Sequence, residues 1–141
     1  LQAAPSQNEL ALTAWIAERP DLAGKIFTYI EPDDIHNPVC RMIIEKAMSE
    51  QDKFEPAAFI NDAGLTTEGR RLAAEVFAWP DRNGSILGKD KSGIEKGLTE
   101  YIRTVKADKI ELEMSKCGSD LRLFGELLRE KNALRNFRVT L

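Results

Sequence analysis

Apolar residues recur every three or four positions through most of this 141-residue chain, and proline or glycine interrupts the pattern at intervals. That spacing is typical of amphipathic helices, and no segment shows the sustained alternation of apolar and polar residues that predicts a half-buried strand. We expect a first helix from Asn8 to about Glu18, which ends before Pro20 because proline disfavours helical backbone in the preceding residue. A short second helix then directs Leu22 and Ile26 inward.

Capping residues mark three further helices before residue 80. Asn37-Pro38 is a start signal, because asparagine caps a helix and proline fits its first position. Pro56 opens another short helix, and Thr66 or Thr67 caps a fifth helix that Pro80 should end. The sequence up to residue 80 therefore predicts five short helices around one core.

The pattern changes after residue 80. Residues 81–93 are rich in glycine, serine and charged residues, and they predict a loop or linker. Residues 94–116 form one long helical pattern, and residues 117–120 combine a glycine stop with an Asp120 cap for a last helix that extends to the end of the chain. The apolar ladders are Ile94, Leu98, Tyr101, Val105 and Leu112 in the long helix, and Leu123, Leu127, Leu134, Phe137 and Leu141 in the last one.

These elements predict an all-α fold, in which a bundle of short helices is followed by a long helix and a C-terminal αα-hairpin. We place the bundle subdomain in residues 1–93 and the hairpin subdomain in residues 94–141. The first part carries ten basic and fifteen acidic residues and the second ten and eight, so the overall charge of −3 combines an acidic bundle with a mildly basic hairpin. With 43% hydrophobic residues the chain is too apolar for intrinsic disorder. No apolar run approaches the ~18 residues of a membrane span, and the acidic balance argues against a dedicated nucleic-acid binder.

Side chains suited to catalysis are few and isolated. His36 is the single histidine and lies among acidic residues, but a zinc site needs three or four ligands. Cys40 lies near the start of a predicted helix, where the helix dipole lowers the pKa of a thiol, yet it adjoins an apolar face. No glycine-rich phosphate loop is present. We therefore expect no catalytic residue, no metal and no cofactor, and we keep a small metal- or thiol-dependent enzyme that uses His36 and Cys40 as an alternative.

The hairpin carries more apolar residues than the pairing of two helices requires. The additional residues are Ile102, Ile110 and Met114 on the long helix, and Leu121, Phe124 and Leu128 on the last one. They either pack against the bundle or form an exposed apolar surface, which would mark a protein-binding site. Basic residues are densest on the last helix, at Arg129, Lys131, Arg135 and Arg138. These form a solvated face, a steering patch for an acidic protein partner, or a nucleic-acid contact.

Four segments follow an order that is similar to a known family. They are Leu10–Trp15, Arg19–Leu22, Ile30–Ile35 and Arg41–Ile44. The chain resembles the C-terminal helicase-interaction domain of bacterial DnaG-type primases, and the same helical subdomain occurs in the N-terminal domain of the replicative helicase. Two features depart from the family pattern: Ile35 stands where an aromatic residue is common, and the loop at residues 81–93 is longer and richer in glycine.

The resemblance implies a non-catalytic interaction domain whose parent protein is a DNA primase, a nucleotidyltransferase with its catalytic parts upstream. The hairpin would anchor primase to the N-terminal domains of the hexameric replicative helicase, and the bundle would modulate helicase activity. Primer synthesis would thereby be coupled to unwinding of the replication fork. The residues that we expect to contact the helicase are Leu121, Phe124, Leu127, Leu128, Lys131, Leu134, Arg135, Phe137 and Arg138.

On its own we expect the domain to be a monomer, without direct nucleic-acid or membrane binding. The chain shows no signal segment, and Cys40 and Cys117 suit a reducing compartment, so we expect a cytoplasmic location at the bacterial replication fork. It begins at Leu1 rather than methionine, which predicts a piece of a longer protein. The alternative from the same resemblance is the N-terminal domain of the helicase itself, which would assemble into rings and bind primase.

Overall fold

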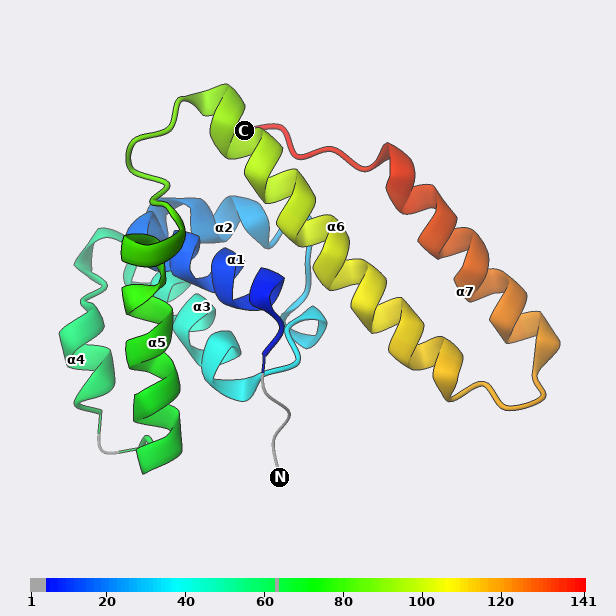
Figure 1. Ribbon diagram of the computed structural model, residues 1–141, viewed down its shortest axis with the longest axis horizontal. Coiled ribbons are helices and arrows are strands. Elements are labelled where there is room, and N and C mark those ends of the chain that lie inside the picture. The colour runs from blue at the N-terminus through cyan, green and yellow to red at the C-terminus, as the bar shows by residue number, and fades with distance from the viewer. Residues whose placement is uncertain (1–4, 63) are drawn as a thin grey trace.

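The chain folds into helices joined by short loops (Figure 1). The computed structural model describes residues 5–62 and 64–141, and these residues contain no strand. The α-helices are α1 (Gln7–Glu18), α2 (Ala23–Ile26), α3 (Pro38–Glu50), α4 (Pro56–Ile60), α5 (Thr67–Asn83), α6 (Lys91–Ser115) and α7 (Leu121–Ala133). Four short 3₁₀ turns accompany them, η1 (Pro20–Leu22), η2 (Pro32–Asp34), η3 (Gln51–Lys53) and η4 (Leu134–Asn136). The predicted all-α fold, with a bundle, a long helix and a terminal hairpin, is confirmed.

Side-chain caps start most of the longer helices. The amide oxygen of Asn37 accepts the N–H groups of Val39 and Cys40 at the start of α3, as the sequence predicts. Asp120 caps α7 in the same manner. The first helix begins slightly earlier than predicted, because Ser6 rather than Asn8 supplies its cap.

The prediction that Pro80 ends the fifth helix is wrong. Helix α5 continues through Pro80 to Asn83, and its last turn is closed by a hydrogen bond from the Gly84 N–H to the Pro80 carbonyl (2.9 Å). A proline here removes one N–H donor from the helix and crowds the carbonyl four residues earlier, and the helix continues for three more residues. Gly84 then ends the helix with a φ of +110°, a conformation that glycine adopts without strain.

The segment predicted as a loop or linker at residues 81–93 contains a shorter loop, at residues 84–90. Its ends belong to α5 and α6, and its centre is held against the bundle by Glu18, whose carboxylate accepts the Ser85 hydroxyl (2.6 Å) and the Ile86 N–H (3.1 Å). The Ile86 side chain is only 1% exposed. The loop is therefore anchored to the bundle through this buried residue.

Helix α1 lies at the centre of the bundle and packs against α3, α5 and the first half of α6. The buried side chains of α6 that join this core are Ile94, Leu98, Ile102 and Val105. Helix α6 begins within the predicted bundle subdomain, because residue 93 lies in its first turn. Its buried side chains join the core of the bundle, so both predicted subdomains contribute to one hydrophobic core. Their division at residues 93 and 94 into separate units stays a prediction.

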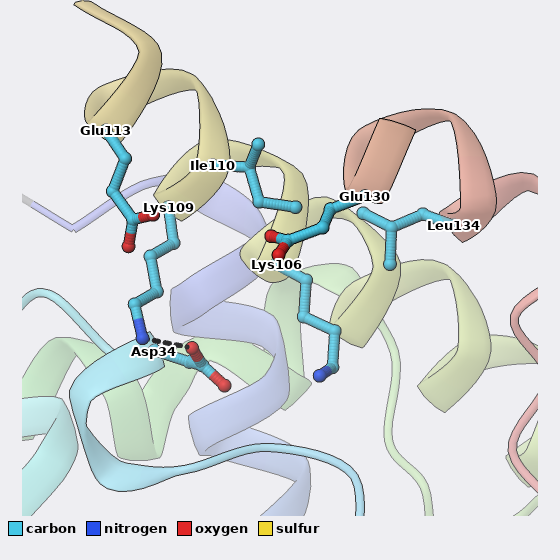
Figure 2. Close-up of a pocket in the computed structure, with 7 residues that line it drawn as sticks. All are labelled: Asp34, Lys106, Lys109, Ile110, Glu113, Glu130 and Leu134. Atoms are coloured by element: carbon cyan, nitrogen blue, oxygen red, sulfur yellow. Dashed lines mark ion pairs between the residues drawn. The ribbon is translucent and has the colours of Figure 1, made fainter. Parts of the chain in front are cut away.

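The second half of α6 and all of α7 form an antiparallel hairpin that projects away from the bundle (Figure 1). At the base of this hairpin, Lys109 of α6 makes an ion pair with Asp34 of η2 (3.0 Å). Figure 2 shows this pair beside a hollow of about 240 Å³ that Glu130 and Leu134 close from the α7 side. The hydrogen bond to Asp34 raises the pKa of Lys109, so the lysine stays charged and ties α6 to the bundle.

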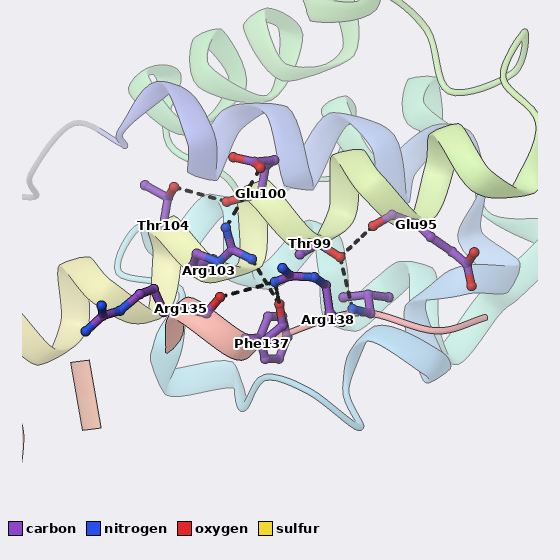
Figure 3. A network of polar contacts seen from close by, with 9 residues as sticks. Glu95, Thr99, Glu100, Arg103, Thr104, Arg135, Phe137 and Arg138 are labelled. Carbon is purple, nitrogen blue, oxygen red and sulfur yellow. Dashed lines mark hydrogen bonds and ion pairs between the residues drawn. The ribbon is translucent and has the colours of Figure 1, made fainter. Parts of the chain in front are cut away.

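The C-terminal segment corrects another prediction. The helical ladder ends at η4, and residues 137–141, here called the C-terminal strap, run in an extended path back along α6. Figure 3 shows the Arg103 guanidinium donating to the Phe137 carbonyl (3.0 Å). The Val139 N–H donates to the Thr99 hydroxyl (2.9 Å). The Val139 side chain is buried in the bundle core. The strap therefore binds the end of the hairpin to the bundle.

Candidate protein-docking surface on the hairpin

Large apolar side chains of α7 face solvent on the hairpin, among them Leu121, Phe124 and Leu128. The exposed fractions are 81% for Leu121, 41% for Phe124 and 40% for Leu128. Spacings of three and four residues place them on one side of the helix. We call these three residues the apolar stripe. Of the two interpretations of the apolar surplus, an exposed surface or packing on the bundle, the structure supports exposure for these three.

The sequence around the turn determines where the stripe begins. Gly118 takes a φ of +61° within the connection between α6 and α7. The Asp120 carboxylate accepts the Leu123 N–H (3.1 Å) and so starts α7. Leu121 is consequently the first residue of the helix. At this position it has no preceding turn of α7 to cover it, which accounts for its high exposure.

Two of the predicted contact residues are not part of the exposed surface. Leu127 is only 5% exposed, and α7 packs mainly against α6, so Leu127 holds the two helices of the hairpin together. Phe137 lies in the strap and packs edge-on against Tyr29 with their ring centroids 5.6 Å apart. Phe137 is half-buried, whereas Leu127 could contact a partner only after a rearrangement.

The predicted basic contacts also differ from one another. Lys131 makes an ion pair with Glu111 of α6 (2.6 Å), and Arg138 donates to the Phe137 carbonyl (2.6 Å). Arg135 is exposed in η4, the 3₁₀ turn that directly follows α7. Leu134 is half-buried beside the hollow of Figure 2. Arg135 is therefore the one predicted cation whose side chain makes no hydrogen bond or ion pair among the described residues.

Two exposed apolar residues of the hairpin were not among the predicted contacts. Leu123 is 40% exposed and Leu112 is 45% exposed. Leu112 follows the buried Val105 by seven residues, so it continues the side of α6 that packs on the bundle. The apolar spacing of the long helix extends past the residues that the bundle covers. This excess is the sequence signal that would have identified Leu112.

The alternative chemistry around His36 and Cys40 has little geometric support. Cys40 is fully buried, and this burial raises the pKa of its thiol to about 12, so the reactive thiolate is disfavoured. His36 is exposed on the loop before α3. Across residues 5–62 and 64–141, no three histidine, cysteine or acidic side chains are grouped closely enough to hold a metal. In the same residues, no helix combines the length and the apolar character needed to cross a membrane.

Comparison with protein-family models, with curated proteins and with solved structures found no significant match to this chain.

Proposed function

We propose that this chain is a non-catalytic docking domain of a bacterial DNA primase, and that its hairpin binds the N-terminal domains of the replicative helicase. The observation that carries the proposal is the apolar stripe of α7, which stays exposed although the bundle has a well-packed core. A group of large apolar side chains at the end of a projecting element is typical of a protein-binding site. The family resemblance supplies the identity of the partner.

The shape of the hairpin suits this role. The first half of α6 is packed into the bundle core. The strap and the Lys109–Asp34 pair hold the hairpin where it joins the bundle. The free end can then enter a groove on the partner as an amphipathic helix, with Leu121, Phe124 and Leu128 as its anchors. Little ordering of the backbone would accompany binding, which favours affinity.

Charge would guide the approach of the partner. Arg122 and Arg129 lie on α7 and Arg135 lies in η4 directly after it, and all three are exposed. Exposed cations of this kind raise the rate of association with an acidic surface more than they raise the affinity. The net charge of the hairpin half is positive, in contrast to the acidic bundle.

The test is a titration of the cognate helicase with the wild-type chain and with Phe124→Ala. Burying an apolar side chain of this size contributes about 1.5–3 kcal/mol, so the variant should bind about ten- to a hundredfold more weakly. Met48→Ala is the matched control, because Met48 is equally exposed (41%) but lies on α3 of the bundle. This control should bind the helicase as the wild type does, and circular dichroism should show both variants folded.

Two results would contradict the proposal. One is equal affinity of the folded Phe124→Ala variant and the wild type. The other is a wild-type chain that sediments as a ring in the absence of the helicase, because self-assembly would favour the alternative of a helicase N-terminal domain.

A further inference from the structure

A hollow of about 440 Å³ lies between α2, the N-terminal end of α6 and the end of the strap. In Figure 1 this region is at the opposite end of α6 from the turn of the hairpin. Four basic side chains line it: Arg19, Lys25, Lys89 and Lys91. They come from four different segments of the chain, and Leu22 and Ile94 supply an apolar floor.

Most of the basic side chains around this hollow make no ion pair among the described residues. Arg19 binds Asp21 through two hydrogen bonds (2.9 and 2.8 Å). The other three basic residues, all lysines, make no ion pair within 4.0 Å in the described part of the chain. Lys89 lies over the ring of Trp15, with its nitrogen 5.9 Å from the centroid. None of the described residues that line the hollow is acidic.

The backbone adds to the positive potential. Lys91 is the first residue of the 25-residue helix α6, and N–H groups of a first turn have no partner within their helix. The Asp90 carboxylate takes one of them, the N–H of Gly93 (2.8 Å). The Asp90 carboxylate offsets part of the positive potential at this helix end, and the helix dipole and the surrounding lysines supply the part that favours a bound anion.

The chemistry of the lining indicates which part of a ligand would bind. Lysine ammonium groups bind phosphate as point charges, and the one guanidinium at the hollow is already hydrogen-bonded to Asp21. No aromatic side chain lines the described part of the hollow, so stacking of a base is not provided. The volume is in the range of small-molecule sites.

We propose that this hollow binds a phosphate-bearing ligand through its phosphate groups, supplied by a free nucleotide or by the backbone of a single-stranded nucleic acid. The site is independent of the docking surface, because its residues lie on other elements than α7. A phosphate ligand and a protein partner could therefore occupy the chain together.

The test is isothermal titration of the chain with sodium tripolyphosphate at low ionic strength. The double variant Lys25→Glu/Lys91→Glu should bind at least tenfold more weakly than the wild type. The matched control Lys53→Glu/Lys116→Glu changes the net charge by the same amount at exposed positions away from the hollow, and it should bind within twofold of the wild type. If the first variant does not fold, Lys25→Gln/Lys91→Gln replaces it, with the expected direction unchanged.

Competition experiments distinguish a free nucleotide from a nucleic-acid backbone. A polyglutamate peptide tests for a carboxylate ligand. Displacement of tripolyphosphate by ATP alone supports a free nucleotide, and displacement by a twelve-residue DNA oligonucleotide supports the nucleic-acid backbone. Three results would overturn the proposal: no binding of tripolyphosphate, equal losses in the two charge-reversed variants, or binding of a polyglutamate peptide without binding of any phosphate probe. None of these results depends on the helicase.

Discussion

At the scale of single residues, Gly97 is a position where a residue distant in the sequence restricts which side chain fits. A Cβ atom built at this position would overlap the Cη2 and Cζ3 atoms of Trp15, which is only 3% exposed. Alanine favours a helix over glycine by about 1 kcal/mol, but overpacking a core costs about 1–3 kcal/mol. Because the overlap is severe, we expect Gly97→Ala to lower the free energy of unfolding by about 2 kcal/mol, measured by urea denaturation.

Gly125 of α7 is the control for this substitution. A Cβ atom there would meet nothing closer than the Arg129 guanidinium at 4.0 Å, so Gly125→Ala should gain helix propensity and raise the free energy of unfolding by up to about 1 kcal/mol. Gly97→Ala that is as stable as the wild type would show that Trp15 has room to move.

Interactions between residues that are close in the sequence could be predicted well. Contacts between residues that are distant in the sequence could not. The caps at Asn37 and Asp120 act on N–H groups two or three residues away, so the sequence contains both partners in one short window. Trp15 and Gly97 are 82 positions apart, and no local pattern links them. Helix α6 is continuous through Gly97, although glycine has a low helix propensity.

At the scale of elements, the least predictable part is the C-terminal strap. Its residues continue the apolar spacing of α7, so periodicity predicted a helix to Leu141. The extended path is instead stabilised by contacts with distant residues, among them the Tyr29 hydroxyl, which donates to the Thr140 carbonyl and accepts the Thr140 N–H (both 3.0 Å). For the same reason the sequence could identify the stripe but could not separate it from Leu127 and Phe137, whose burial depends on α6 and on Tyr29.

The hydrogen bond between the strap and α6 can be tested with Thr99→Val. Valine keeps the shape of threonine but leaves the buried Val139 N–H without its acceptor, which costs about 1–3 kcal/mol of unfolding free energy. Thr104→Val is the control, because the Thr104 hydroxyl donates to a carbonyl of its own helix, as that of Thr99 does, and no described hydrogen bond joins it to the strap. Thermal unfolding should show a clear loss for the first variant and a change within about 0.5 kcal/mol for the second. Equal effects would argue that the strap adds no stability.

At the scale of the whole molecule, the helical content follows from the sequence, but the way in which its parts cooperate depends on the core. Ile94, Leu98 and Ile102 of α6 lie in the same core as α1, whereas Leu127 is the one side chain of α7 that is buried among the described residues. Elements with few buried contacts open locally at lower free energy than the core. We therefore expect α1 and the first half of α6 to unfold together, and the free end of α7 to open separately.

Hydrogen exchange in Ile102→Val measures this division directly. Loss of one buried methyl group lowers the stability of the core by about 0.5–1.5 kcal/mol, so core amides in α1 and in residues 94–105 should exchange about two- to tenfold faster than in the wild type. Amides of residues 121–128 should exchange at the wild-type rate, because their local opening leaves Ile102 in place. If the α7 amides accelerate by the same factor, the chain opens as one unit; if only the α6 amides accelerate, α1 does not share its core. Either result would contradict a rigid base that carries a separately opening hairpin end.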